Sequence, residues 1–255
     1  MSLAFLDAQG NVIQQYTLHL KKKHAKKLPA TVRDNLLPSQ AQKIAKRKMT
    51  GIAPGMNRFQ WDLRYASATN VIGWEPPEYT DGMTASASGP LVNPGRYTVV
   101  LRYGGHSYRQ TFQVKLDPRL HTTAAILKQH LALQLALHRT VDVLDHDINA
   151  AILLRRRLVK AVAAHQIDAA TAGPAIEELH EAVHAVVQRH VRSSEGDVMH
   201  NMRLRSFLAY LQSNIGLDYR APDPAQIAAF NKLEGEAQKG EARLRTATAA
   251  GARLL

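Results

Sequence analysis

Apolar and polar residues alternate with the two-residue period of β-strands through much of the first 120 residues. The runs that alternate in this way span residues 3–7, 12–18, 57–65, 97–103 and 108–116. The first two runs flank a turn sequence that contains Gly10, and the last two flank Gly104 and Gly105. Because glycine readily takes the positive φ of tight hairpin turns, these four runs predict two β-hairpins.

The remaining run, residues 57–65, shows the cleanest alternation. Four large apolar side chains in it are expected to point to one face, and the charged or polar residues between them to the other. These four residues are Phe59, Trp61, Leu63 and Tyr65. We expect a half-buried strand with Trp61 in the core, like the buried tryptophan of immunoglobulin-like sandwiches.

The apolar period changes from two toward 3.6 residues after residues 117–119, which indicates a change from strands to helices. Apolar residues then recur every three or four positions from 122 to about 165, without glycine or proline. This spacing predicts one helix up to ~65 Å long, or two nearly collinear helices. Further helices are expected to start at Gly173-Pro174, reaching about Val191, at Asn201 and at Asp223-Pro224.

The helical spacing also predicts which side chains face inward. In the long helix the expected buried stripe is Leu137, Val141, Leu144, Ile148 and Ile152. In the second helix it is Ile176, Leu179, Val183 and Val186. In the last two helices the expected inward residues are Leu204, Phe207, Leu208, Leu211, Ile227, Phe230, Leu233 and Ala237. Helices with such stripes bury them against one another, which favours an antiparallel arrangement.

These patterns predict an α+β chain with two domains, for which 255 residues are sufficient. Residues 1–120 are expected to form an immunoglobulin-like β-sandwich with a basic insertion at 21–50 and a long loop at 66–94. This loop is rich in Ser, Thr, Gly and Pro. Residues 121–255 are expected to form an antiparallel helical bundle with one very long helix.

The composition, 45% apolar and 21% charged residues, is typical of a globular protein. No run approaches the roughly 20 apolar residues that a bilayer requires, so we expect no membrane span. The N-terminal sequence lacks a basic stretch followed by a long apolar one, so no signal peptide is expected. The absence of cysteine excludes disulfides and thiolate chemistry but leaves the cellular compartment open.

The net charge of +12 is concentrated in one segment. Residues 21–50 contain ten Lys or Arg and one acid, and therefore carry +9, which leaves +3 for the rest of the chain. The part from Lys21 to Lys48 is a candidate for binding a polyanion, nucleic acid or an acidic glycan, through counterion release. Because aromatic residues are not interleaved with these lysines, we favour a solvated insertion.

Several motifs resemble the C-terminal region of bacterial sortilin-like, BNR-repeat β-propeller proteins, which are commonly labelled glycosyl hydrolases. In the β part the motifs are NRFQWDLRY at 57–65, GP at 89–90, PGRYTV at 94–99 and DPR at 117–119. In the helical part they are LAYLQSN at 208–214 and DYRAPDP at 218–224. The tryptophan-containing motif and PGRY are also similar to the immunoglobulin-like module of flagellar hook-capping proteins. The resemblance covers nearly the whole chain.

The resemblance implies a non-catalytic structural or interaction module, because the propeller that precedes this region in the family is missing from the chain. It implies a protein partner, either that propeller or a second copy, and a periplasmic or secreted location. An alternative is an accessory segment that supplies loops to a glycoside hydrolase active site. The basic segment from Lys21 to Lys48 is longer than the family's linker.

The sequence His180-Glu181-Ala182-Val183-His184 matches the H-E-x-x-H pattern, which places two imidazoles on one helix face for Zn²⁺. His190 stands where a third ligand would, but Val187 replaces the turn glycine that would aim it. If the helix continued, His190 would point away from the other two imidazoles. We therefore expect histidines at the border of a buried stripe rather than a metal site.

The long loop contains a candidate glycan contact. Trp74 and Tyr79 lie beside two acids, Glu75 and Glu78, but their spacing in a proline-rich loop favours packing of Trp74 over the sandwich edge. No nucleotide-binding or nucleophile motif occurs in the chain. The sequence therefore assigns no catalytic, cofactor-binding or metal-binding residue. The predicted helices carry a second apolar face, with residues such as Leu131, Leu135 and Leu153, which favours a protein partner.

Overall fold

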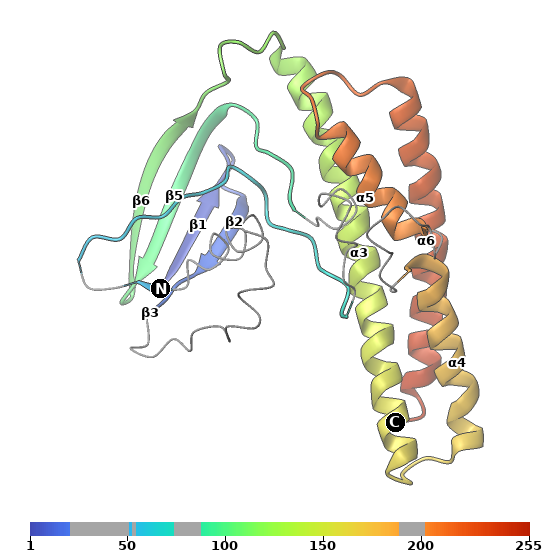
Figure 1. Cartoon of the computed structure of the whole chain (residues 1–255). Coiled ribbons are helices and arrows are strands. Elements are labelled where there is room, and N and C mark those ends of the chain that lie inside the picture. Colours follow the sequence, from blue (N-terminus) through green and yellow to red (C-terminus); the bar gives the residue numbers. More distant parts are fainter. Residues whose placement is uncertain (21–50, 53–54, 74–87, 189–201) are drawn as a thin grey trace, which may run out of the picture. The chain divides into compact units, whose positions relative to one another are not determined.

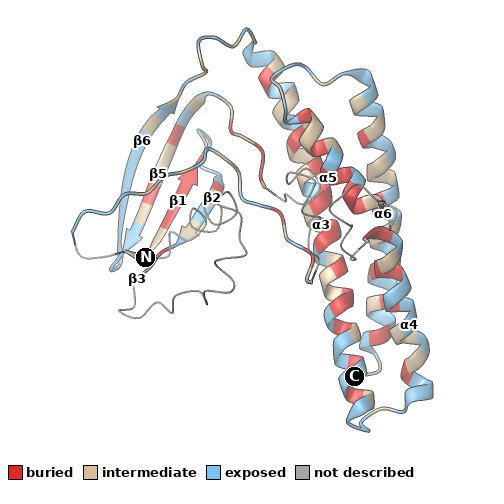
Figure 2. Ribbon diagram, in the orientation of Figure 1, coloured by how far each residue is buried: buried red, intermediate tan, exposed pale blue. Residues whose placement is uncertain are grey.

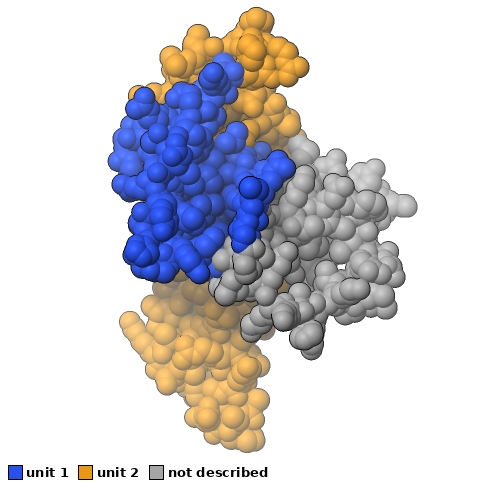
Figure 3. Space-filling view, turned by 90° about the vertical axis from the view of Figure 1, so that its left-hand side faces the viewer, with its two compact units in different colours: residues 1–66, 94–116 blue, residues 67–93, 117–255 orange. Residues whose placement is uncertain are grey.

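The computed structural model describes residues 1–20, 51–52, 55–73, 88–188 and 202–255. The chain is a mixed α+β protein that divides into two compact units, shown in two colours in Figure 3. The first, called the β unit, contains residues 1–66 and 94–116, and the second, called the helical unit, contains 67–93 and 117–255. Across the described part of the chain, none of the helices combines the length and apolarity that a bilayer crossing needs.

The β unit contains a small four-stranded antiparallel sheet in the order β2-β1-β5-β6 (Figure 1). Its strands are β1 (Ser2–Leu6), β2 (Val12–Thr17), β5 (Gly95–Tyr103) and β6 (His106–Val114). Both predicted hairpins are confirmed, since β1 pairs with β2 and β5 pairs with β6. In the second hairpin Gly104 and Gly105 both take positive φ, which only glycine adopts without strain.

Two further short strands, β3 (His19–Leu20) and β4 (Gly51–Ile52), form a parallel pair. The four-stranded sheet and this pair are the sheets that the described residues form. Most of β6 is exposed (Figure 2), whereas four of the five residues of β1 are buried. The second layer of an immunoglobulin-like sandwich therefore stays a prediction.

The prediction of a strand at residues 57–65 is wrong. These residues form no ladder, apart from an isolated bridge at Arg64. Leu63 takes a left-handed φ of 59° and is 39% exposed, so the alternation that the sequence suggests ends there. The physical reason is local: the Asp62 carboxylate accepts a hydrogen bond from the Arg64 backbone N, and Trp61 Nε1 donates to the Arg64 carbonyl. These bonds fix a bend in place of a strand.

The helical unit contains four helices: α3 (Ala124–Ala163), α4 (Ala169–Val186), α5 (Leu204–Ile215) and α6 (Pro224–Ala252). The predicted long stripe forms the single 40-residue helix α3, which contacts each of the other three helices. Side chains cap three of the N-termini, because Thr123, Asp168 and Asp223 accept hydrogen bonds from the first turns. Asp223 and Gln226 complete a capping box at α6.

The second helix differs from its prediction at both ends. It starts at Ala169 rather than at Gly173-Pro174, because the Asp168 carboxylate caps it by accepting from Thr171 N at 3.0 Å. Pro174 therefore lies inside α4. The helix stops at Val186, short of the predicted Val191, because Val187 is extended and buries its side chain completely.

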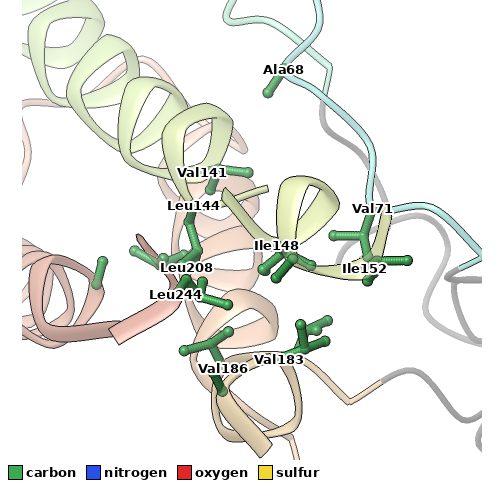
Figure 4. Close-up of a cluster of buried hydrophobic side chains, with 14 of the residues drawn as sticks. Ala68, Val71, Val141, Leu144, Ile148, Ile152, Val183, Val186, Leu208 and Leu244 are labelled. Atoms are coloured by element: carbon green, nitrogen blue, oxygen red, sulfur yellow. The ribbon is translucent and has the colours of Figure 1, made fainter. Parts of the chain in front are cut away.

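Most of the predicted buried stripes are confirmed and form one core within the helical unit (Figure 4). The fully buried members include Leu137, Leu144, Ile148, Leu158, Leu179, Leu208 and Leu244. Figure 2 shows the buried positions of α3 in red. Phe207 and Ile227 were predicted to face inward but are 45% and 44% exposed. In α5 the inward side instead carries Arg205, which forms an ion pair in the core, and Phe207, two positions later, points away.

The segment 67–73 belongs to the helical unit, although it precedes β5 in the chain. Ala68 and Val71 join the helical core. The backbone N of Thr69 donates to the Asp142 carboxylate at 2.7 Å. The Asn149 side chain accepts from Ile72 N and donates to the Asn70 carbonyl, both at 2.8 Å. Two polar side chains of α3 therefore fix a stretch that the sequence indicates only as part of a loop.

Replacement by alanine is expected to have opposite effects on stability at two glycines of α6. A Cβ at Gly240 would lie 2.7 Å from Val186 Cγ1, whereas a Cβ at Gly235 would have nothing within 4 Å. We expect Gly240→Ala to lower the free energy of unfolding by about 1–3 kcal/mol through overpacking. We expect Gly235→Ala to raise it by about 0.5–1 kcal/mol, because alanine is the better helix former. Urea denaturation followed by circular dichroism measures both; stabilisation by both variants would contradict the close approach of α4 and α6.

Candidate functional site

The two histidines of the H-E-x-x-H pattern lie beside a pocket in the helical unit. Their rings are stacked, with centroids 6.1 Å apart, because residues four positions apart share a helix face. His180 is exposed and His184 is half-buried. The pocket has a volume of about 380 Å³, and the described residues that line it are Gly73, Arg155, His180, Val183, His184, Val187 and Gln188.

Arg155 of α3 gives this pocket a positive charge. It has no ion-pair or hydrogen-bond partner among the described residues, and its Nε is fully buried without an acceptor. No carboxylate is among the described residues that line the pocket. A smaller hollow of about 120 Å³ shares Arg155, His180 and Val183 and adds Arg156. Donors without acceptors around a pocket suit an anion rather than a cation.

The pocket lies between helices because of how α3 and α4 meet. Ile152 on α3 and Val183 on α4 are both buried in the shared core; Ile152 borders the smaller hollow and Val183 borders both. Arg155 follows Ile152 by three positions, and His180 precedes Val183 by three, so each of these two polar side chains lies one helical turn from the core contact. The buried stripes thus bring the polar side chains at their borders together.

The expectation that His180 and His184 hold no zinc stays a prediction. Among the described residues, no group of three His, Cys, Asp or Glu side chains is placed to hold a metal ion. The Arg155 guanidinium beside the two imidazoles adds charge that repels a cation. His190 lies outside the described residues, as do Trp74, Glu75, Glu78, Tyr79 and the whole basic segment from Lys21 to Lys48.

Asp145 and Arg205 form a second cluster of charge that the sequence did not indicate. Both side chains are completely buried, and Arg205 Nη2 lies 2.9 Å from Asp145 Oδ2. Burial raises the pKa of Asp145 above its usual range, although the hydrogen bonds and the charge of Arg205 act in the opposite direction. Because neither side chain reaches solvent, we interpret this pair as part of the core rather than a ligand site.

An exposed set of large apolar side chains lies on α5, on the link to α6 and at the start of α6. Its members are Phe207, Tyr210, Leu217, Tyr219 and Ile227, and Leu217 is the most exposed at 72%. We call it the α5–α6 surface. Of the residues on which the sequence based a partner face, Leu153 is 48% exposed, whereas Leu131 and Leu135 are half-buried.

Comparison of the chain with protein-family models, with curated proteins and with solved structures finds no match.

Proposed function

We propose that this chain is a non-catalytic structural and interaction module from the C-terminal part of a BNR-repeat propeller protein of the sortilin-like, glycosyl-hydrolase-labelled type. In this proposal the β unit is an immunoglobulin-like module and the helical unit is an antiparallel bundle with one very long helix. The motifs at 57–65, 94–99 and 218–224 support this parentage. Such a protein would be periplasmic or secreted.

The α5–α6 surface is the observation that supports an interaction role. Five large apolar side chains that are 38–72% exposed lie on successive elements of one unit. Two of them are tyrosines and one is a phenylalanine, residue types that are enriched in protein interfaces because they bury large areas with few rotatable bonds. Exposed apolar side chains that form a contiguous patch mark interaction sites, and we propose that these five form one. The proposed partner is the propeller or a second copy of the chain.

The parentage is tested by the coding sequence upstream of Met1. We expect it to continue in frame into repeats of a β-propeller. An in-frame stop codon directly upstream, preceded by an unrelated gene, would contradict this parentage. This test needs no folded protein and is independent of the surface experiment that follows.

The interaction surface is tested by replacing Tyr210 and Leu217 with serine in one variant. We expect the variant to weaken association, either with itself or with the propeller expressed separately, by tenfold or more, because truncated apolar anchors commonly cost over 1 kcal/mol each. Sedimentation velocity and titration calorimetry measure the two associations. Val12→Ser, at an exposed apolar residue of the β unit, is the matched control and should leave association unchanged. Equal association of the wild type and the double variant would refute this role of the surface.

A further inference from the structure

We propose that the pocket lined by Arg155, His180 and His184 binds a small organic oxyanion, a phosphate or carboxylate group attached to a short apolar body. This inference does not depend on the proposed function, because it concerns a separate place on the helical unit.

Arg155 is the anchor of the proposed site. Its guanidinium presents up to five N–H donors in a planar fork that matches the two oxygens of a carboxylate or phosphate. Buried hydrogen-bond donors in proteins normally have acceptors, because a buried donor without an acceptor keeps its full cost of desolvation. Arg155 Nε is buried without an acceptor, and no described side chain neutralises the guanidinium. A bound oxyanion supplies both the acceptor and the opposite charge.

The two imidazoles extend the donor set on the α4 side. His180 and His184 lie one turn apart, with stacked rings, and both border the same pocket as Arg155. Neither has a hydrogen-bond partner among the described residues. Each imidazole can present one N–H when neutral and two when protonated, so either state donates to an oxyanion.

The size and lining of the pocket point to an organic ligand rather than a bare ion. A volume of about 380 Å³ is in the range of about 300–1,000 Å³ that is typical of small-molecule sites. Val183 and Val187 contribute apolar surface beside the Arg155 guanidinium and the two imidazoles. This combination of an apolar wall with a few polar groups is how small-molecule sites fix the orientation of a ligand.

The test uses three probes of similar shape: phenyl phosphate, benzoate and the neutral benzyl alcohol. Titrations of the whole chain are followed by the proton resonances of the histidine rings. We expect saturable shifts of His180 and His184 with at least one anionic probe and none with benzyl alcohol. Binding of phenyl phosphate alone assigns a phosphate ligand, and binding of benzoate alone assigns a carboxylate. Absence of saturable binding by both anions at millimolar concentration would overturn the proposal.

Matched variants distinguish binding in this pocket from non-specific attraction of the anion to the positive charge of the protein. Arg155→Gln and Arg157→Gln remove the same charge from the same helix, but Arg157 is exposed and does not line the pocket. We expect Arg155→Gln to weaken binding at least tenfold and Arg157→Gln to change it less than twofold. His184→Gln should weaken binding measurably, whereas His146→Gln, at an exposed histidine of α3, should not. Equal losses in Arg155→Gln and Arg157→Gln, with unchanged thermal unfolding of both, would show non-specific attraction and overturn the proposal.

Discussion

Replacing Arg205 with methionine is expected to lower the free energy of unfolding of the helical unit by about 3–5 kcal/mol at neutral pH. Both members of the Asp145–Arg205 pair are completely buried, and Arg205 Nε and Nη2 donate to the carboxylate at 2.9–3.2 Å. The substitution leaves the Asp145 carboxylate in the core without its cation. Removing one partner costs more than the pair contributes, because the remaining charge keeps its full penalty of desolvation.

This loss of stability should depend on pH in a defined direction. Burial already raises the pKa of Asp145, and the two effects of Arg205 that lower it, hydrogen bonding and charge, disappear in Arg205→Met. A carboxyl group whose pKa is higher in the folded state binds protons more readily there than in the unfolded chain. The destabilisation is therefore complete above the folded-state pKa and decreases as the pH falls toward about 4, the ordinary pKa of aspartate.

Urea denaturation at several pH values, followed by circular dichroism, measures this dependence. Asp145→Asn is the matched control, because it leaves the Arg205 cation buried beside a neutral amide that does not titrate. We expect its loss of stability to stay nearly constant over the range in which Arg205→Met recovers. A constant loss in both variants would show that the damage comes from packing rather than from the buried carboxylate.

The double variant Asp145→Leu with Arg205→Met completes the cycle. It removes both charges and fills the space with apolar side chains of similar length. We expect its stability to be close to that of the wild type, or higher by up to about 4 kcal/mol, as is seen when buried pairs are replaced by well-packed apolar residues. A double variant as unstable as Arg205→Met would contradict an electrostatic origin of the effect.

Elements that are determined by neighbouring residues could be predicted from the sequence. The turn at Gly104 and Gly105 requires positive φ, and the start of α6 needs only Asp223, Pro224 and Gln226, so both are encoded locally. The long stripe of α3 also appears in its own spacing. The prediction at Leu63 failed although its cause is also local, because the alternation of apolar residues there does not reveal the side-chain hydrogen bonds that replace the expected strand with a bend.

The candidate pocket could be predicted only in part. The spacing of His180 and His184 predicts two side chains on one face of α4, at the border of its buried stripe. Arg155 lies 25 positions earlier in a run of three arginines, and nothing in that run distinguishes it from Arg156 and Arg157. Its place in the pocket depends on how α3 packs against α4, and the anion site proposed above rests on that packing. The Asp145–Arg205 pair spans 60 positions and was missed for the same reason.

Replacing Phe5 with alanine is the second change for which a large effect is expected, a loss of about 3–5 kcal/mol from the β unit. Phe5 is almost completely buried near the C-terminal end of β1. Its ring stacks on Trp61 with the centroids 4.3 Å apart, and the rings of Tyr16, Phe59 and Phe112 lie 5.9–6.3 Å away. The substitution leaves a cavity that five rings border or fill in the wild type, and stacked or edge-on rings add to the loss from burial.

The measurement is urea denaturation followed by tryptophan emission in a Trp74→Phe background, in which Trp61 is the only remaining tryptophan. Tyr108→Ala is the matched control, because Tyr108 is an aromatic residue of the same sheet but is 58% exposed. We expect the control to change stability by less than about 0.5 kcal/mol, as is usual at exposed sites. A loss below 1 kcal/mol in Phe5→Ala would contradict a central role of this ring in the β unit.

The emission of Trp61 in native buffer adds a test of what holds residues 57–65 in place. Since these residues form no ladder beyond the bridge at Arg64, their attachment depends on side-chain contacts. These are the stacking of Trp61 on Phe5, the tilted contact of Phe59 with Tyr16, and the hydrogen bond from Gln14 Nε2 to the Tyr65 carbonyl. We expect the Phe5→Ala variant to shift the emission to the longer wavelength of a solvated indole, even where the sheet remains folded. If the emission stays unchanged, the contacts of the Trp61 ring with Tyr97 and Phe112 are sufficient to keep the indole in place.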